Sequence, residues 1–410
     1  MQGIVFDNGA QGDGLILHEG KKLFVSNTIK GEEIEYHVID DHRAEVNQIL
    51  KKSEQRAEPV CPYFEKCGGC CLQHFNQEAY KAHKLRYLRQ LLPENYPAFD
   101  EPVFVPYNQR RRVSFAITII GKACYFGLNQ KESDQVIEIK SCPVLVPELN
   151  QLIPALHKLM KGLSYPVKKG TGDVSLLLTD TGVDMLITLP FQYNNQIRET
   201  LIDFAVQNNL ARICWRLSER DLADIIVQPH QPVLKIGDYE ITPPPGVFLQ
   251  PSKAGEIALQ ETVKSYLGNK PKRIIDLFCG AGTFSLGLLE KKKIISGVDN
   301  APYALEVLNK ASSDRIKTEN RDLFKVPLYP DELEKIDAIV FDPPRAGAKK
   351  QAENLAISNI SVIVAVSCNP VTFVRDAEIL IKGGYKLEKI RPVDQFVFTP
   401  HLELVALFRK

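Results

Sequence analysis

The 410-residue sequence lacks an uncharged apolar run of the roughly 18 residues that a membrane-spanning helix needs. Its beginning, MQGIVFDNGAQGDG, lacks the basic and then apolar order of a signal peptide. These two absences argue against a membrane or exported protein, and we expect a cytoplasmic one. The sequence also has no internal repeat and no low-complexity tail. Its length is typical of two or three globular domains.

An excess of one charge is also missing. The 51 Lys and Arg residues nearly balance the 50 Asp and Glu residues, which leaves a formal net charge of +1. This balance argues against a protein that coats nucleic acid nonspecifically. It leaves open a local basic groove, because phosphate attraction depends on where the charges lie.

Cysteine, by contrast, is well represented, with nine residues. A disulfide framework is a poor explanation in a cytoplasmic protein because the cytosol keeps thiols reduced. Clustered cysteines, such as those between Cys61 and Cys71, are therefore better explained by metal binding. A cysteine in an exposed turn is a candidate for catalysis.

The chain divides into three predicted regions. Residues 1–56 contain short alternating strands, among them KLFV and EIEYHVI, broken by glycines. They predict a small closed β-barrel, either a nucleic-acid-binding module or a purely structural one. Residues 57–240 hold the cysteine cluster, a basic helix over 77–92 and a mixed α/β region. The proline-rich segment ITPPPGVFLQPS leads into the last region, residues 241–410.

The last region has the pattern of a doubly wound α/β sheet. Four apolar strands, KRIIDLF, KIISGVD, IDAIVFDPP and ISVIVAVSC, alternate with helical segments, as expected for buried parallel strands. Ligands bind at the carboxyl ends of such strands. The polar and glycine residues of this region fall at those ends, so we expect the functional site there.

The first two strands predict a nucleotide-like cofactor site. Asp276 opens the segment DLFCGAGTF, in which Gly280 and Gly282 allow a ligand to approach the backbone. Asp299 ends the second strand, where an acidic residue commonly binds ribose hydroxyls. Because Thr283 follows the glycines in place of a further glycine motif, we favour S-adenosylmethionine over a dinucleotide or a turn without ligand.

The other two strands supply candidate catalytic groups. The third ends in Asp342 and two prolines, a stiff turn suited to presenting a carboxylate. The fourth ends at Cys368, which lies in a polar turn at the predicted site rather than inside the strand, so we interpret it as a nucleophile. In the terminal segment TPHLELVALF, Glu403 is the favoured general base and His401 its rival.

With DLFCGAGTF, DPPRAG, SCNPVTFVRD and the terminal HLE in this order, the chain resembles the RNA uracil-5 methyltransferases, particularly the 23S ribosomal RNA type. The resemblance spans nearly the whole chain. It implies a Rossmann-like class I methyltransferase domain, an N-terminal TRAM-type barrel that binds RNA, and a central iron-sulfur domain. It implies addition of Cys368 to carbon 6 of uracil, methyl transfer to carbon 5, and removal of the carbon 5 proton by Glu403.

Other roles follow from the same resemblance. Gln250 matches a glutamine between cofactor and uracil, and Asp342 matches a carboxylate near the base. The implied cofactor contacts are Phe278, Gly280, Gly282, Thr283 and Asp299, with either Asn320 or Asp322. A 4Fe-4S cluster is implied at Cys61, Cys67, Cys70 and Cys142, with Cys71 as an alternative to Cys70. The residues alone leave zinc nearly equal to iron-sulfur, and Cys124, Cys214 and Cys279 are interpreted as packing residues.

The chain departs from the family pattern in three places. Pro251 and Ser252 follow Gln250 where an asparagine is frequent, FVFT stands for FPxT before the terminal HLE, and Asp299 replaces the commoner glutamate. Two alternative functions stay open: methylation of the transfer RNA T-loop, and a non-catalytic RNA-binding iron-sulfur protein. Phosphate contacts are considered for seven basic residues: Lys81, Lys84, Arg86, Arg89, Arg110, Arg111 and Arg112.

Overall fold

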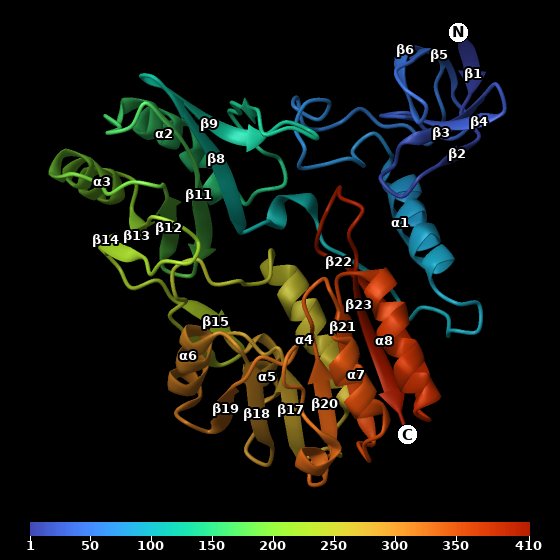
Figure 1. Cartoon of the computed structure of the whole chain (residues 1–410), viewed down its shortest axis with the longest axis vertical. Helices are drawn as coiled ribbons and strands as arrows, with labels where there is room; N and C mark the ends of the chain where they lie inside the picture. The colour runs from blue at the N-terminus through green and yellow to red at the C-terminus, as the bar shows by residue number, and fades with distance from the viewer.

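The computed structural model describes residues 1–410 and contains three large β-sheets (Figure 1). The first is a six-stranded sheet of the N-terminal region, in the order β1-β5-β6-β4-β3-β2. Alternate residues point inward, and Ile16, Leu23, Ile34 and Tyr36 form part of its core. Its strands are β1 (Gln2–Ile4), β2 (Asp7–Asn8), β3 (Gly14–His18), β4 (Lys21–Val25), β5 (Glu33–Val38) and β6 (Arg43–Lys51).

This sheet is a curled half-barrel, where the sequence predicted a closed barrel. Its outer strands β1 and β2 are consecutive in the chain and have three and two residues. Between them, the Val5 N–H donates to the Glu32 carbonyl. The Phe6 N–H donates to the Leu15 carbonyl of β3. The predicted strands KLFV and EIEYHVI are confirmed as β4 and β5.

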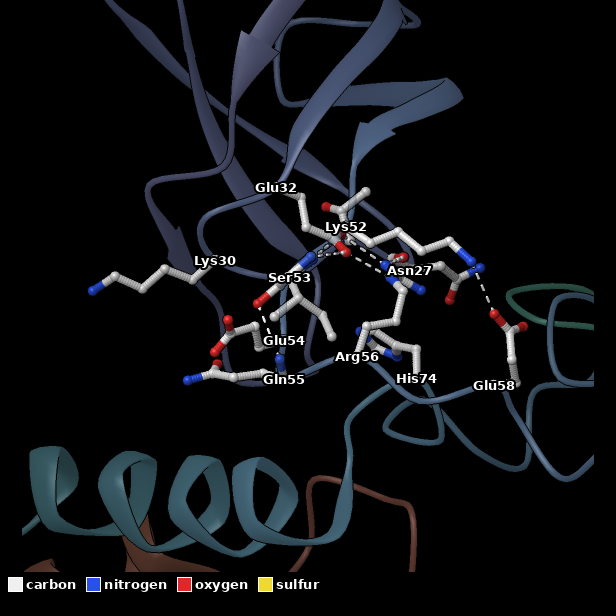
Figure 2. Close-up of polar contacts among 12 residues, drawn as sticks. Asn27, Lys30, Glu32, Lys52, Ser53, Glu54, Gln55, Arg56, Glu58 and His74 are labelled. Carbon is white, nitrogen blue, oxygen red and sulfur yellow. Dashed lines mark hydrogen bonds and ion pairs between the residues drawn. The ribbon is translucent and has the colours of Figure 1, made fainter.

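A buried ion pair fixes the half-barrel to the segment that follows it (Figure 2). The Glu32 carboxylate accepts hydrogen bonds from Arg56 Nε at 2.5 Å and Arg56 Nη2 at 2.7 Å. It also accepts the Ile29 N–H, while Arg56 Nη2 donates to the Asn27 carbonyl at 2.7 Å. Burial raises the pKa of Glu32, but these donors outweigh burial and hold the pKa below its usual range.

The central region is built around a seven-stranded sheet in the order β10-β9-β8-β11-β12-β13-β14. Helices α2 (Pro147–Gly162) and α3 (Asn195–Gln207) cover it, and Phe115, Phe126 and Trp215 are fully buried in the shared core. The strands are β8 (Arg112–Ile120), β9 (Ala123–Asn129), β10 (Val136–Ile137), β11 (Lys169–Thr179), β12 (Gly182–Thr188), β13 (Leu210–Arg216) and β14 (Asp224–Val227). A hairpin of β15 (Leu234–Ile236) and β16 (Tyr239–Ile241) leads to the last region.

The last region contains an eight-stranded sheet in the order β19-β18-β17-β20-β21-β23-β22-β7. Strands β17 to β21 are parallel, β23 is antiparallel to β21, and β22 is antiparallel to β23. The predicted doubly wound sheet is confirmed. Its strands are β17 (Arg273–Leu277), β18 (Ile294–Asp299), β19 (Ile316–Asn320), β20 (Ala338–Phe341), β21 (Val362–Ser367), β22 (Lys386–Asp394), β23 (Glu403–Arg409) and β7 (Val103–Phe104).

Helices cover both faces of this sheet because successive strand residues point to opposite sides. Ile274 belongs to the core on one face and Ile275 to the core on the other. The first face packs against α4 (Lys253–Leu267), α5 (Thr283–Leu288) and α6 (Pro302–Ser312). The second packs against α7 (Lys349–Ala356), α8 (Pro370–Lys382) and, from far away in the sequence, α1 (Gln77–Leu91).

Helix α1 confirms the predicted basic helix. Asn76 caps it by accepting the Ala79 N–H, and Leu88 and Leu92 enter the core of the eight-stranded sheet. Figure 1 shows α1 between the half-barrel and α8. Two 3-10 turns, Tyr107–Gln109 and Pro330–Leu333, complete the regular structure. None of the helices combines the length and apolar character needed to cross a membrane.

We expect Arg56→Met to loosen the half-barrel. The change leaves the fully buried Glu32 carboxylate without its cation, which costs roughly 3–5 kcal/mol for a buried pair. Hydrogen exchange of β5 and β6 should therefore accelerate by about 100-fold or more. Because the pKa of Glu32 is depressed in the folded protein, the stabilisation is present above its unfolded pKa and fades as the pH falls.

Arg43→Met is the matched control, because Arg43 pairs with Glu132 at the exposed surface. Such pairs contribute about 1 kcal/mol or less. Equal exchange rates in the two variants would contradict an anchoring role for Arg56.

Candidate active site

The candidate site forms at the edge of the eight-stranded sheet where the parallel strands end. Asp342 follows β20, and Cys368 follows β21. Glu403 begins β23, which runs in the opposite direction, so its first residue lies at the same edge. The register pairs Ser367 with Leu404, directly beside Cys368 and Glu403. The structure thus brings together the proposed nucleophile, base and carboxylate.

The pKa of each of these three groups lies above its usual value. Burial, then the charges of Glu403 and Asp342, raise the pKa of the Cys368 thiol to about 11, and Arg345 opposes them in part. Burial raises the pKa of Glu403 to about 7 against an opposing hydrogen bond from Gln395. Burial, with the charges of Glu403 and Asp276, raises the pKa of Asp342 well above its usual range. Two acids of this site therefore hold or share protons near neutral pH.

The structure places Gln250 close to Glu403, linked to it through a residue that the sequence did not reveal. Gln395 Nε2 donates to Gln250 Oε1 at 2.7 Å and to Glu403 Oε1 at 3.3 Å. All three side chains are buried. The signal for Gln395 was its place in the stretch before HLE, where the chain departs from the family pattern.

The predicted cofactor loop joins β17 to α5. Phe278 and Gly280 both have positive φ, at 64° and 52°, and open space lies where a Gly280 side chain would be. Gly282, at φ 93°, has another role, because a Cβ there would meet Leu308 Cδ1 at 2.4 Å. Gly280 thus keeps a backbone surface open to a ligand, whereas Gly282 permits packing against α6.

Asp299 closes this loop from the end of β18. One of its oxygens accepts the Gly280 N–H at 2.9 Å, and the other accepts the Ala301 N–H at 2.9 Å. Thr283 begins α5 beside the loop, and its carbonyl accepts Gln260 Nε2. Phe278, Gly280, Gly282 and Thr283 thus lie on one continuous loop, which Asp299 holds through the Gly280 N–H.

The two alternative contacts after β18 differ in their surroundings. Asn320 ends β19, pairs in register with Asp299 and is exposed. Asp322 accepts the Phe324 N–H at 3.0 Å and forms an ion pair with Lys325. Asn320 is the last residue of β19 and Asp322 lies two residues beyond it, and the choice between them stays a prediction.

Asp276 is a further buried acid next to the cofactor loop. Its Oδ2 accepts the Ser285 N–H and hydroxyl at 3.0 and 2.6 Å. Its Oδ1 is buried without a partner. Burial raises its pKa to about 7, with a contribution from Asp299. The sequence marked Asp276 only as the residue that opens the glycine turn.

The four predicted metal-ligating cysteines line one cavity of about 800 Å³, together with Cys71 and with Arg345, Gln395 and His401 from the catalytic side. No three His, Cys, Asp or Glu side chains are grouped closely enough to hold a single metal ion. Burial and the neighbouring thiols raise the pKa of Cys70 to about 12. Cys124, Cys214 and Cys279 are buried elsewhere, where the packing interpretation placed them.

The interpretation of the basic residues as phosphate contacts was wrong for several of them. Lys84 is buried in an ion pair with Asp394, with Nζ 2.6 Å from Oδ1, and Arg111 is buried in a pair with Glu256. Arg89 donates to backbone carbonyls beyond its own helix. Charge patterns in a sequence do not reveal these distant acidic and carbonyl partners.

The remaining basic residues have partners too. Arg110 Nε donates to the Arg112 carbonyl, and Arg112 donates to the Leu249 carbonyl and lies over the Phe248 ring. Arg86 pairs with Asp7 of the half-barrel at a partly exposed position. Lys81 lies over the Phe104 ring.

The fold and the site are those of a class of α/β transferase with a nucleotide-like cofactor loop and a thiol beside two acids. Residues 315–410 match the family model described as tRNA (Uracil-5-)-methyltransferase. An RNA methyltransferase of Brucella suis is 36% identical over 409 residues, covering 98% of this chain and 96% of the relative. The chain belongs to the RNA uracil-5-methyltransferase family.

Two other similarities concern substrate type and fold. The 23S rRNA (uracil(1939)-C(5))-methyltransferase of Vibrio parahaemolyticus is 31% identical over 417 residues, covering 97% of this chain and 93% of the relative. The solved tRNA (uracil-54, C5)-methyltransferase of Pyrococcus abyssi has a TM-score of 0.77 at 22% identity and covers 100% of this chain and 99% of its own. The latter shows a shared fold over the full length.

Removal of the Glu403 charge should make Cys368 more reactive. Glu403→Gln deletes a negative charge that raises the thiol pKa, so more thiolate is present at pH 8. We expect alkylation by iodoacetamide to accelerate roughly three- to tenfold, since the thiolate is the reactive form. Mass spectrometry of the peptide that contains Cys368 gives the rate.

Glu388→Gln serves as the control, because Glu388 is an acid of the same sheet that pairs with Arg409 away from the site. An alkylation rate that is unchanged in Glu403→Gln would show that this acid does not act on the thiol.

Proposed function

We propose that this protein transfers a methyl group from S-adenosylmethionine to carbon 5 of a uridine in structured RNA, with 23S ribosomal RNA as the favoured substrate. The observation that carries the proposal is the convergence of Cys368, Glu403 and Asp342 at one edge of the sheet. Family membership supports the reaction type.

The chemistry requires a nucleophile and a base. Carbon 5 of uracil is too weakly nucleophilic to attack a methyl sulfonium, so the Cys368 sulfur, as a thiolate that has lost its proton, first adds to carbon 6 and moves electron density to carbon 5 and oxygen 4. Carbon 5 then takes the methyl group of S-adenosylmethionine, the second substrate, as the methyl–sulfonium bond breaks and S-adenosylhomocysteine leaves. Glu403 then removes the carbon 5 proton, and the sulfur leaves as the ring regains its double bond.

The raised pKa values suit these roles. Glu403, with a pKa of about 7, can accept a proton and release it again near neutral pH. Asp342 keeps its proton because burial and Glu403 raise its pKa. A protonated Asp342 donates a hydrogen bond to the uracil oxygen that gains negative charge. Gln250, joined to Glu403 through Gln395, contacts the base or the cofactor.

For S-adenosylmethionine we propose a site on the loop after β17. Gly280 leaves its backbone open, Phe278 and Thr283 flank it, and Asp299 reaches the ribose. Gly282 shapes the turn, and Asn320 or Asp322 supplies a further contact. The Pyrococcus abyssi structure of the same fold was determined in complex with S-adenosyl-L-homocysteine, which supports this use of the loop.

The Vibrio parahaemolyticus relative supports ribosomal RNA as the substrate. The Pyrococcus abyssi enzyme supports the alternative, a transfer RNA. We propose three working units: residues 1–56 as a TRAM-like RNA-binding module, 57–240 as a central iron-sulfur region, and 241–410 as the methyltransferase domain. Exposed Phe6 and Phe24, with Lys22 near the Phe6 ring, give the first unit a surface suited to bases and phosphates.

We further propose a 4Fe-4S cluster held by Cys61, Cys67, Cys70 and Cys142. Four thiols on one cavity are a soft donor set that suits iron-sulfur or zinc. The role of the cluster here is folding or RNA positioning.

Glu403→Gln should trap the enzyme on its RNA. Sulfur addition and methyl transfer still proceed, but the carbon 5 proton stays, so the thioether to Cys368 persists. We expect a denaturation-resistant protein–RNA band when the variant is incubated with S-adenosylmethionine and ribosomal or transfer RNA transcripts. The transcript that gives the band identifies the substrate class.

The double variant Cys368→Ala/Glu403→Gln is the matched control and should give no such band. A band of equal strength from the double variant would assign the covalent link to another residue. The absence of a band from Glu403→Gln with both RNAs would remove Glu403 from the proposed role.

Iron and acid-labile sulfide should accompany the protein in equal amounts after anaerobic purification. Cys142→Ser removes the distant proposed ligand and should lower both, whereas Cys124→Ser, at a buried packing position, should retain them. Stoichiometric zinc without sulfide would overturn the assignment of the cluster.

A further inference from the structure

Residues 395–402 form the loop between β22 and β23. This loop contacts the cysteine segment at Cys71 and leads directly to the proposed base, Glu403. Its first residue, Gln395, is 3% exposed, although it carries an amide. Its Nε2 group donates to both Gln250 and Glu403. One buried amide therefore links the two site positions that the sequence predicted, Gln250 and Glu403, through direct hydrogen bonds.

The Gln395 side chain has little room to move. A Cβ at Gly255 of α4 would lie 2.6 Å from Gln395 Cβ and 2.7 Å from its Oε1. The same Cβ would lie 2.7 Å from Ser252 Oγ, which caps α4 by accepting the Gly255 N–H. The amide is therefore packed closely against the first turn of α4, and only glycine at 255 leaves this space.

Helix α1 and the cysteine segment hold the same loop from the other side. Lys84 Nζ donates to Asp394 Oδ1 at 2.6 Å, and the Tyr80 hydroxyl donates to Asp394 Oδ2 at 2.5 Å. The Tyr80 hydroxyl also accepts the Phe398 N–H, and the Phe398 carbonyl accepts the N–H groups of Cys71 and Leu72. Phe398 has a positive φ of 61°, a conformation that these contacts maintain.

We propose that Gln395 is a positioning residue for proton removal, whose amide holds the Glu403 carboxylate beside Gln250 and favours its ionised form. This inference rests on the proposed function of Glu403. Helix α1 and the cysteine segment fix the loop that carries Gln395, so the amide meets Glu403 in a single arrangement.

The charged groups around Glu403 define the expected pH effect. Asp342, from the end of β20, and Cys368, from the end of β21, both interact with the Glu403 charge. Arg345 and His401 lie nearby on the cavity wall. Burial raises the pKa of Glu403, and Gln395 opposes that rise. Loss of the amide donor therefore moves the pKa of Glu403 further upward, so a higher pH is needed to ionise the base.

The test uses Gln395→Met, which has a similar volume without the donor. The enzyme, S-adenosylmethionine and the RNA transcript that Glu403→Gln traps are mixed in a single turnover between pH 6 and 9. Denaturing gels follow formation and decay of the covalent adduct. We expect formation that is no slower, about tenfold slower decay at pH 7, the size expected for a lost hydrogen bond to a charged group, and a decay midpoint at higher pH.

Gly255→Ala provides an independent variant, because it keeps the amide but displaces it from Glu403. It should slow decay in the same direction. Gly162→Ala is its control, since that helical glycine of α2 has open space at its Cβ position. It should behave as the unchanged protein.

Three outcomes separate the hypotheses. Decay of the Gln395→Met adduct with the normal rate and pH midpoint would overturn the positioning role. An equal fall of formation and decay at every pH would indicate a general structural defect and would also overturn it. If Glu403→Gln itself traps no adduct, the failure lies in the proposed function and not in the inference about Gln395.

Discussion

The antiparallel pairing of β23 with β21 is the constraint on which the site depends. Parallel strands bring their carboxyl ends to one edge, and this alone places Asp342 and Cys368 together. A base from the end of the chain reaches the same edge only if its strand runs in the opposite direction. The pairing of Ser367 with Leu404 provides this arrangement and fixes Glu403 beside the thiol.

The same pairing concentrates acids in a buried place. Asp276, Asp342 and Glu403 all have raised pKa values because burial disfavours their charged forms. Charges that repel one another cost stability, and functional sites commonly keep such arrangements because they adjust proton transfer. The high pKa of Cys368 follows from burial and from the same cluster of acids, and Arg345 opposes that rise in part.

Local patterns in the sequence were enough to predict four parallel strands of the last sheet, β17, β18, β20 and β21, and the placement of Cys368 and Asp299 at strand ends. Each of these features depends on a few consecutive residues, an apolar strand followed by a polar turn. The partners of Lys84 and Gln395 could not be predicted in this way. Asp394 lies 310 residues from Lys84, and Gln250 lies 145 residues from Gln395.

The central claim is that the sulfur of Cys368 activates the pyrimidine ring. The most direct measurement compares methyl transfer from labelled S-adenosylmethionine to RNA by the unchanged protein and by Cys368→Ala, alongside the affinity of each for S-adenosylmethionine. The account predicts that the variant binds the methyl donor with nearly normal affinity, since Cys368 lies outside the loop after β17, and transfers no methyl group to the RNA. Methyl transfer at the normal rate by Cys368→Ala would contradict it.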